Sequence, residues 1–242
     1  MIYLIALGAF AATMLGGLFA FRFRDKLHIV TGFSAGAVIG VAFFDLLPES
    51  IELATTGYTL TLVTTMIALG FSIFMILDRM LTLHAHDAHG DHHCENKIHK
   101  RILGGGSFST HSFLDGLAIG LSFQVSFAVG IVVAVAVLAH DFSDGVNTVS
   151  IILKNQGKRS EALSWLFVDA LAPVLGIIVA SFITIPSATL GLALAVFCGF
   201  FLYIGASDLL PESHHAHPTY WTTLSTLVGI ASIYFIIQIA TV

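Results

Sequence analysis

The stretches His111-Ser-Phe-Leu-Asp-Gly116 and His140-Asp-Phe-Ser-Asp-Gly145 share the pattern His-x-Phe-x-Asp-Gly, and both lie inside long apolar segments. On a helix, positions i and i+4 share a face, so each stretch directs one imidazole and one carboxylate the same way. Ionisable side chains are costly in hydrocarbon and persist where they line an ion or substrate path. The two stretches therefore predict a polar site between two membrane-spanning helices.

The composition places the chain among integral membrane proteins. Of its 242 residues, 56% are hydrophobic and only 10% are charged, far more apolar than an ordinary globular domain. Ten lysines and arginines cannot coat a nucleic-acid surface, so the expected surroundings are the lipid bilayer and no nucleic acid. Only two cysteines are present, Cys94 and Cys198, which argues against a disulfide framework.

The hydropathy pattern predicts an all-α protein with eight transmembrane helices. A span needs roughly 20 apolar residues, with about 17–25 tolerated. Eight segments qualify: 2–21, 28–47, 58–81, 103–124, 126–152, 161–183, 188–210 and 220–241. The first is interpreted as a retained span rather than a signal peptide, because no basic region precedes it.

The basic residues test this topology. All ten lie in or at the ends of the connections between spans one and two, three and four, or five and six, on one side of the membrane: Arg22, Arg24, Lys26, Arg79, Lys97, Lys100, Arg101, Lys154, Lys158 and Arg159. The positive-inside rule makes that side cytoplasmic and puts both termini outside. A multi-pass protein of the cell (inner) membrane is therefore expected.

A repeated hexapeptide indicates internal symmetry. Asp45-Leu-Leu-Pro-Glu-Ser50 closes the second predicted span and Asp208-Leu-Leu-Pro-Glu-Ser213 the seventh, so identical sequences mark opposite membrane faces. Inverted repeats are common in secondary transporters, where they create two alternative gates. The alternative is that each proline merely ends a helix.

The repeat divides a single transmembrane domain into a 3+2+3 arrangement: a three-helix repeat 1–81, a His-rich cytoplasmic loop 82–102, a central helix pair 103–160 and a second three-helix repeat 161–242. Four acids of the hexapeptides are candidates for a transport pathway, or else simply sit at the membrane interface: Asp45, Glu49, Asp208 and Glu212.

The central pair carries the candidate metal ligands: His111, Ser112, Asp115, His140, Asp141 and Asp144. At roughly 1.5 Å of rise per residue, both sets come near the middle of the bilayer. Imidazole and carboxylate together suit zinc and iron, and manganese where oxygen dominates. Asp169, one turn before Pro173 in span six, is either a further ligand or a local partner of a broken helix.

The hydrophilic loop is rich in histidine, and such tracts commonly bind metal loosely. Its candidates for metal capture are His84, His86, His89, His92, His93 and His99. The alternative is a solvated linker that happens to be histidine-rich.

At these motifs the chain resembles the ZIP (Zrt/Irt-like) family of divalent metal transporters. The family's fourth span carries His-Asn-x-x-Asp/Glu-Gly, matched here by His111, Ser112, Asp115 and Gly116. Its fifth span carries His-Asp/Glu-x-Pro-His/Glu, matched by His140, Asp141, Phe142, Ser143 and Asp144. Ser112 replaces the asparagine, Ser143 replaces the proline, and Ala172 stands where some relatives place an acid. The last change disfavours a second metal position unless Asp169, one turn away, substitutes for that acid. The resemblance implies that spans one, four, five and six move as a unit against the other four.

The predicted function is uptake of a divalent metal, zinc before iron, manganese or cadmium, with no resident cofactor. A rival from another class is an intramembrane metal-dependent hydrolase, but the fifth span lacks the His-Glu-x-x-His of zinc proteases. Metal export on the same scaffold is the third alternative. The sequence leaves open the physiological metal, the direction of flux, the coupling ion, one metal or two, and whether the protein is a homodimer.

Overall fold

The computed structural model describes residues 2–22, 27–83, 93–215 and 220–240, and this part of the chain is helical without strands. The α-helices are α1 (Ile2–Ala20), α2 (Leu27–Val41), α3 (Leu47–Ala54), α4 (Leu60–Leu83), α5 (His93–Val125), α6 (Phe127–Lys154), α7 (Arg159–Ala180), α8 (Ser187–Tyr203), α9 (Leu210–His215) and α10 (Tyr220–Ala240). Two π-helical turns, η1 (Ala42–Leu46) and η2 (Ile204–Leu209), join α2 to α3 and α8 to α9. The prediction of an all-α membrane protein is confirmed.

Seven helical segments of the described chain are long and apolar enough to cross a membrane. The fourth predicted span, 103–124, forms the second half of α5 and falls outside this set, because glycine, serine, threonine and the site residues dilute its apolar character. Within the predicted loop 82–102, α4 extends to Leu83 and α5 begins at His93.

The repeated hexapeptides do not end their helices, which corrects the predicted ends of spans two and seven. A proline has no N–H to donate, and its ring clashes with the carbonyl four residues earlier. Here the chain absorbs both effects in the π-helical turn before each proline, where the N–H of Leu47 bonds to Ala42 and that of Leu210 to Gly205. The helix then continues to Ala54 in one case and to His215 in the other.

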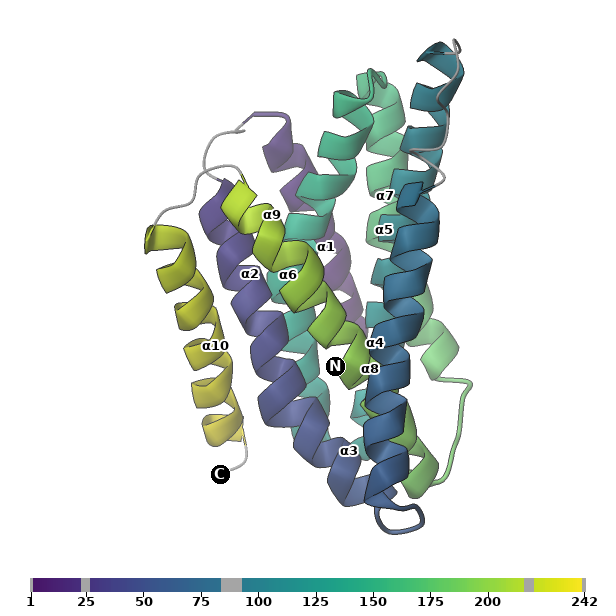
Figure 1. Ribbon diagram of the computed structural model, residues 1–242, viewed down its shortest axis with the longest axis vertical. Helices are drawn as coiled ribbons and strands as arrows, with labels where there is room; N and C mark the ends of the chain where they lie inside the picture. Colours follow the sequence, from purple (N-terminus) through teal and green to yellow (C-terminus); the bar gives the residue numbers. More distant parts are fainter. Residues whose placement is uncertain (1, 23–26, 84–92, 216–219, 241–242) are drawn as a thin grey trace.

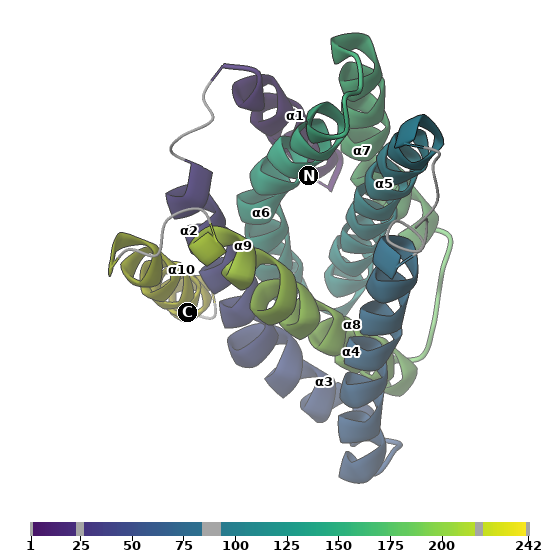
Figure 2. The same cartoon turned by 45° about the horizontal axis from the view of Figure 1, so that its top comes forward.

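The helices form two bundles with thinner packing between them. Helices α1, α5, α6 and α7 pack extensively on one another, and α2, α3, α4, α8 and α10 make up the second group. In Figure 1, α10 lies along α2 at one edge and α4 lies beside α8, while Figure 2 places α1, α6, α7 and α5 around the other side. The largest buried apolar cluster, with Val38, Ile119, Val137 and Phe201, joins the bundles.

Reciprocal glycine contacts hold helices together in pairs within each bundle. In each pair, a Cβ added to either glycine would overlap with the backbone of the other helix, so the helices approach more closely than other residues permit. The pairs are Gly16 with Gly145 (α1–α6), Gly116 with Gly176 (α5–α7), Gly36 with Gly229 (α2–α10) and Gly70 with Gly199 (α4–α8). Gly36 and Gly199 both lie nine residues before the acid that begins the repeated hexapeptide.

Candidate metal site

Two neighbouring helices supply the four side chains of a buried cluster. His111 and Asp115 are one turn apart on α5, and His140 and Asp144 are one turn apart on α6. Each pair therefore projects from one helix face. All four residues are at most 5% exposed, so neither carboxylate has solvent to compensate its charge.

The four ligand atoms lie within 4.8 Å of one another. Asp115 Oδ2 lies 3.1 Å from His111 Nε2 and 3.2 Å from His140 Nε2. Asp144 Oδ2 lies 3.4 Å from His111 Nε2 and 3.7 Å from His140 Nε2. Atoms bound at about 2.0–2.2 Å to a tetrahedral zinc are about 3.4 Å apart, so this spacing suits a single ion.

A backbone contact outside the cluster orients the ring of His140. Its Nδ1 donates a hydrogen bond to the carbonyl oxygen of Ala136 at 2.9 Å, since a carbonyl oxygen only accepts. In the neutral ring the lone pair is then on Nε2, which faces Asp115. A lone pair and a carboxylate repel each other, so a proton or a cation must lie between them. An outer hydrogen bond of this kind commonly fixes the tautomer of metal-binding histidines.

Asp169 lies outside the four-atom cluster and is bound by hydroxyl groups instead. Ser112 on α5 donates to its Oδ1 at 2.8 Å, and Thr148 on α6 donates to its Oδ2 at 2.8 Å. The side chain of Asp169, on α7, is fully buried. Ser112 and Asp169, both predicted as candidate ligands, therefore bind each other through a hydrogen bond. Thr148 was not singled out from the sequence, although its position one turn after Asp144 puts both on one helix face.

Asp141 is the remaining candidate of the central pair. It is fully buried, and neither of its carboxylate oxygens has a hydrogen-bond partner in the described part of the chain. It does not belong to the four-atom cluster. A buried carboxylate without hydrogen bonds is costly, and proximity to a cation is one way to compensate it.

Aromatic rings from the second bundle cover the two imidazoles. The ring centroid of His111 lies 5.8 Å from Phe74 on α4 and 5.5 Å from Phe200 on α8, and that of His140 lies 6.1 Å from Phe201. The site is thus at the junction of the two bundles. Sequence reasoning missed these residues, because 20 phenylalanines are spread over the chain without a pattern that marks three of them.

The predicted pathway residues lie on the second bundle. Asp45 is in η1 and is 7% exposed, and its Oδ2 has no hydrogen-bond partner among the described residues. Glu49 is half-buried on α3. Asp208 and Glu212 lie in η2 and α9, but their side chains are outside the described set.

Most of the predicted loop residues lie outside the described part. His84, His86, His89 and His92 belong to the undescribed segment 84–92. The other two, His93 and His99, are in the first turns of α5, and their side chains are likewise not described.

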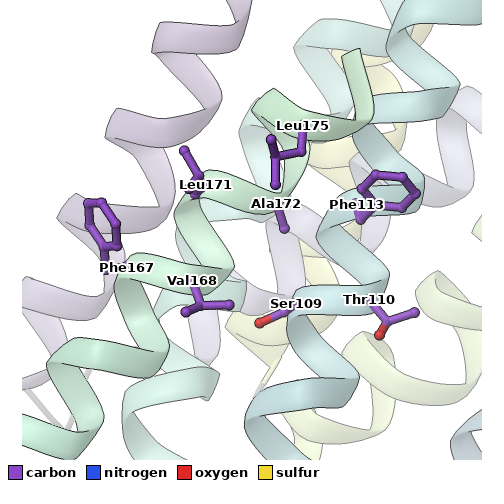
Figure 3. Close-up of a pocket in the computed structure, with 8 residues that line it drawn as sticks. All are labelled: Ser109, Thr110, Phe113, Phe167, Val168, Leu171, Ala172 and Leu175. Atoms are coloured by element: carbon purple, nitrogen blue, oxygen red, sulfur yellow. The ribbon is translucent and has the colours of Figure 1, made fainter. Parts of the chain in front are cut away.

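A hollow of about 340 Å³ lies between α5 and α7 (Figure 3), and none of the four cluster residues lines it. Its lining is apolar apart from two hydroxyls, and Ser109 and Thr110 direct these to carbonyls of their own helix. Ala172 lines this hollow. The position where some relatives carry an acid therefore faces apolar surroundings here.

Comparison with known proteins identifies the family. The sequence profile described as "ZIP Zinc transporter" matches residues 106–237, more than half of the chain and the whole of the four-residue cluster. The chain is 26% identical over 237 residues to the zinc transporter ZupT of Corynebacterium aurimucosum, covering 91% of this chain and 89% of that protein.

Animal relatives match over shorter regions. The chain is 28% identical over 178 residues to human zinc transporter ZIP10, and 39% identical over 106 residues to mouse metal cation symporter ZIP14. It covers about a fifth of the length of each, 21% in both cases. The buried His/Asp cluster, the membrane-spanning helices and the family match agree, and the chain belongs to the ZIP zinc transporter family, whose members are transporters and not enzymes.

Proposed function

We propose that this protein carries zinc across the membrane into the cytosol, and that His111, Asp115, His140 and Asp144 bind the ion midway. The spacing of the four ligand atoms is the observation that supports this assignment most strongly. A set of two imidazole nitrogens and two carboxylate oxygens suits zinc better than calcium or magnesium, which favour oxygen and more ligands. Zinc is also the metal in the names of the relatives ZupT and ZIP10.

The ion would approach past Asp45 and Glu49 and leave past Asp208 and Glu212, where the histidines of the loop could receive it. The buried Oδ2 of Asp45 without a hydrogen-bond partner in the described chain supports the outer half of this path. Asp141, buried beside the ligands, would add negative charge that attracts a divalent ion.

We further propose that the two halves, 1–81 and 161–242, are inverted repeats around the central pair 103–160. The π-helical turns, the prolines after them and the glycines nine residues before the acids correspond between the halves. Such symmetry would give equivalent gates on opposite sides of the membrane. Both termini would lie outside the cytoplasm, because the basic residues then face inward.

The test is zinc flux into proteoliposomes that contain purified protein of known orientation and an internal zinc-sensitive dye. We expect the dye to respond when zinc is added outside vesicles that have the basic loops inside. This response should require the protein. Flux only in the reverse direction would indicate an exporter. Competition by cadmium, iron and manganese in the same assay ranks the metals, and zinc should be the strongest competitor of labelled zinc.

A further inference from the structure

Asp169 connects three helices of the first bundle at the level of the cluster. Its carboxylate, on α7, accepts one hydrogen bond from Ser112 on α5 and one from Thr148 on α6, both at 2.8 Å. Asp169 and both hydroxyl donors are fully buried. Hydrogen bonds to a charged acceptor are roughly twice as strong as neutral ones, and burial keeps water from replacing them.

The two donors are adjacent to the ligands in sequence and in space. Ser112 directly follows His111, and Thr148 lies one turn after Asp144 on the same helix face. A constraint on the Ser112 hydroxyl fixes how α5 is rotated at His111, and a constraint on Thr148 does the same for α6 at Asp144. A single carboxylate therefore sets the relative rotation of the two helices that carry the cluster.

We propose that Asp169 is a positioning residue that holds α5 and α6 in register for metal binding through Ser112 and Thr148, and that it is not itself a ligand. This inference rests on the proposed function of the cluster. Both carboxylate oxygens of Asp169 are already used by hydroxyl donors, and Asp169 is not among the four residues whose ligand atoms converge. Outer partners that orient metal ligands typically contribute 10–100-fold to metal affinity.

Four variants of the purified protein and one control separate positioning from ligation and from a pure charge effect. Asp169→Ala removes both hydrogen bonds. Asp169→Asn removes the charge but keeps one acceptor and gains a donor that a hydroxyl oxygen can accept. Ser112→Ala/Thr148→Val leaves Asp169 in place without its two hydroxyl donors. If this double variant folds poorly, Thr148→Val alone replaces it and keeps the Ser112 donor. Thr226→Val is the matched control, because among the described residues this buried hydroxyl donates to the carbonyl of Thr222 on its own helix, α10, and to no other group.

Zinc affinity by titration calorimetry is the first measurement, and the number of atoms bound to zinc by X-ray absorption is the second. Positioning predicts that Asp169→Ala and the hydroxyl double variant both lose affinity, about 10–100-fold, with an unchanged ligand number. Asp169→Asn should retain clearly more affinity than Asp169→Ala, and Thr226→Val should match the wild type. Size-exclusion profiles and thermal midpoints report whether each variant is folded.

Three results would overturn the inference. Unchanged or tighter zinc binding after removal of the hydroxyls indicates ligation, because the donors would then have competed with the metal for Asp169. A lower ligand number in Asp169→Ala or Asp169→Asn indicates the same. Equal losses in Asp169→Asn and Asp169→Ala indicate that only the charge matters. Absence of zinc binding to the wild type would instead overturn the proposed function, so the two failures are distinct.

Discussion

Replacing Gly116 by alanine should push α5 and α7 apart at the level of the cluster. A Cβ on Gly116 would overlap with the carbonyl oxygen of Pro173 and lie 2.7 Å from the carbonyl carbon and Cα of that residue. Carbon atoms prefer separations of about 3.5–4.0 Å, so the helices must move apart by about 1 Å. Neither helix can yield locally, because the clash is with backbone.

That displacement has two expected costs. Overpacking of this kind typically destabilises by about 1–3 kcal/mol, which corresponds to a fall of about 2–12 °C in the thermal midpoint for a chain of this length. The hydrogen bond from Ser112 to Asp169, 2.8 Å at present, would also lengthen to about 3.8 Å, beyond hydrogen-bond range. Zinc affinity should therefore fall together with stability.

The matched control is Gly106→Ala on the same helix, where an added Cβ meets no atom within 4 Å. Alanine is favoured over glycine in a helix by about 0.5–1 kcal/mol, so this variant should be as stable as the wild type or slightly more. Thermal unfolding in detergent and zinc titration are measured on both variants. Indistinguishable midpoints and affinities for Gly116→Ala and Gly106→Ala would refute the close α5–α7 contact.

Three further predictions concern the second bundle and the protein surface. Gly199→Ala should lower the thermal midpoint by a similar amount, since its Cβ would overlap the backbone of α4, yet leave zinc affinity of the folded protein near that of the wild type; a loss of affinity without loss of stability would contradict this. Phe74→Leu removes three aromatic contacts, each worth roughly 0.5–1.5 kcal/mol, and should lower the midpoint more than Phe182→Leu, whose ring is 83% exposed; equal effects would speak against the aromatic cover of the site. Glu161→Gln breaks a partly exposed 2.9 Å ion pair with Arg101 and should cost at most about 1 kcal/mol in unfolding experiments, so a drop of many degrees would show that this pair matters more than its exposure implies.

The clustering of His111, Asp115, His140 and Asp144 was predictable because it depends on local geometry. Helix periodicity alone places His111 with Asp115 and His140 with Asp144, and a tight turn makes their helices neighbours. The role of Asp169 could not be decided in the same way, because it depends on the rotation of α7 against two other helices. Packing of distant glycines sets that rotation, and a single sequence contains no direct signal of it.

The helix ends near the repeated hexapeptides could not be predicted from the sequence. A proline usually ends or kinks a helix, and helix termination at Pro48 and Pro211 was the sequence-based alternative to the inverted repeat. The structure continues both helices through a π-helical turn. Whether a turn widens or the helix stops depends on the packing that surrounds it, such as the Cys198 thiol, which donates a second hydrogen bond to the carbonyl oxygen of Ala42 at the start of the turn. The repeat predicted that the backbone would be alike at the two hexapeptides, but it did not predict a π-helical turn at both.

The most direct test of the central claim is zinc uptake by proteoliposomes that contain Asp144→Ala, compared with the wild type at equal protein content. Asp144 Oδ2 lies 3.4 Å from His111 Nε2 and 3.7 Å from His140 Nε2 and has no hydrogen-bond partner in the described chain, which supports the proposal that it binds the ion. The account predicts that folded Asp144→Ala protein loses zinc uptake and zinc binding. Uptake at the wild-type rate by this variant would contradict the assignment of the mid-membrane site.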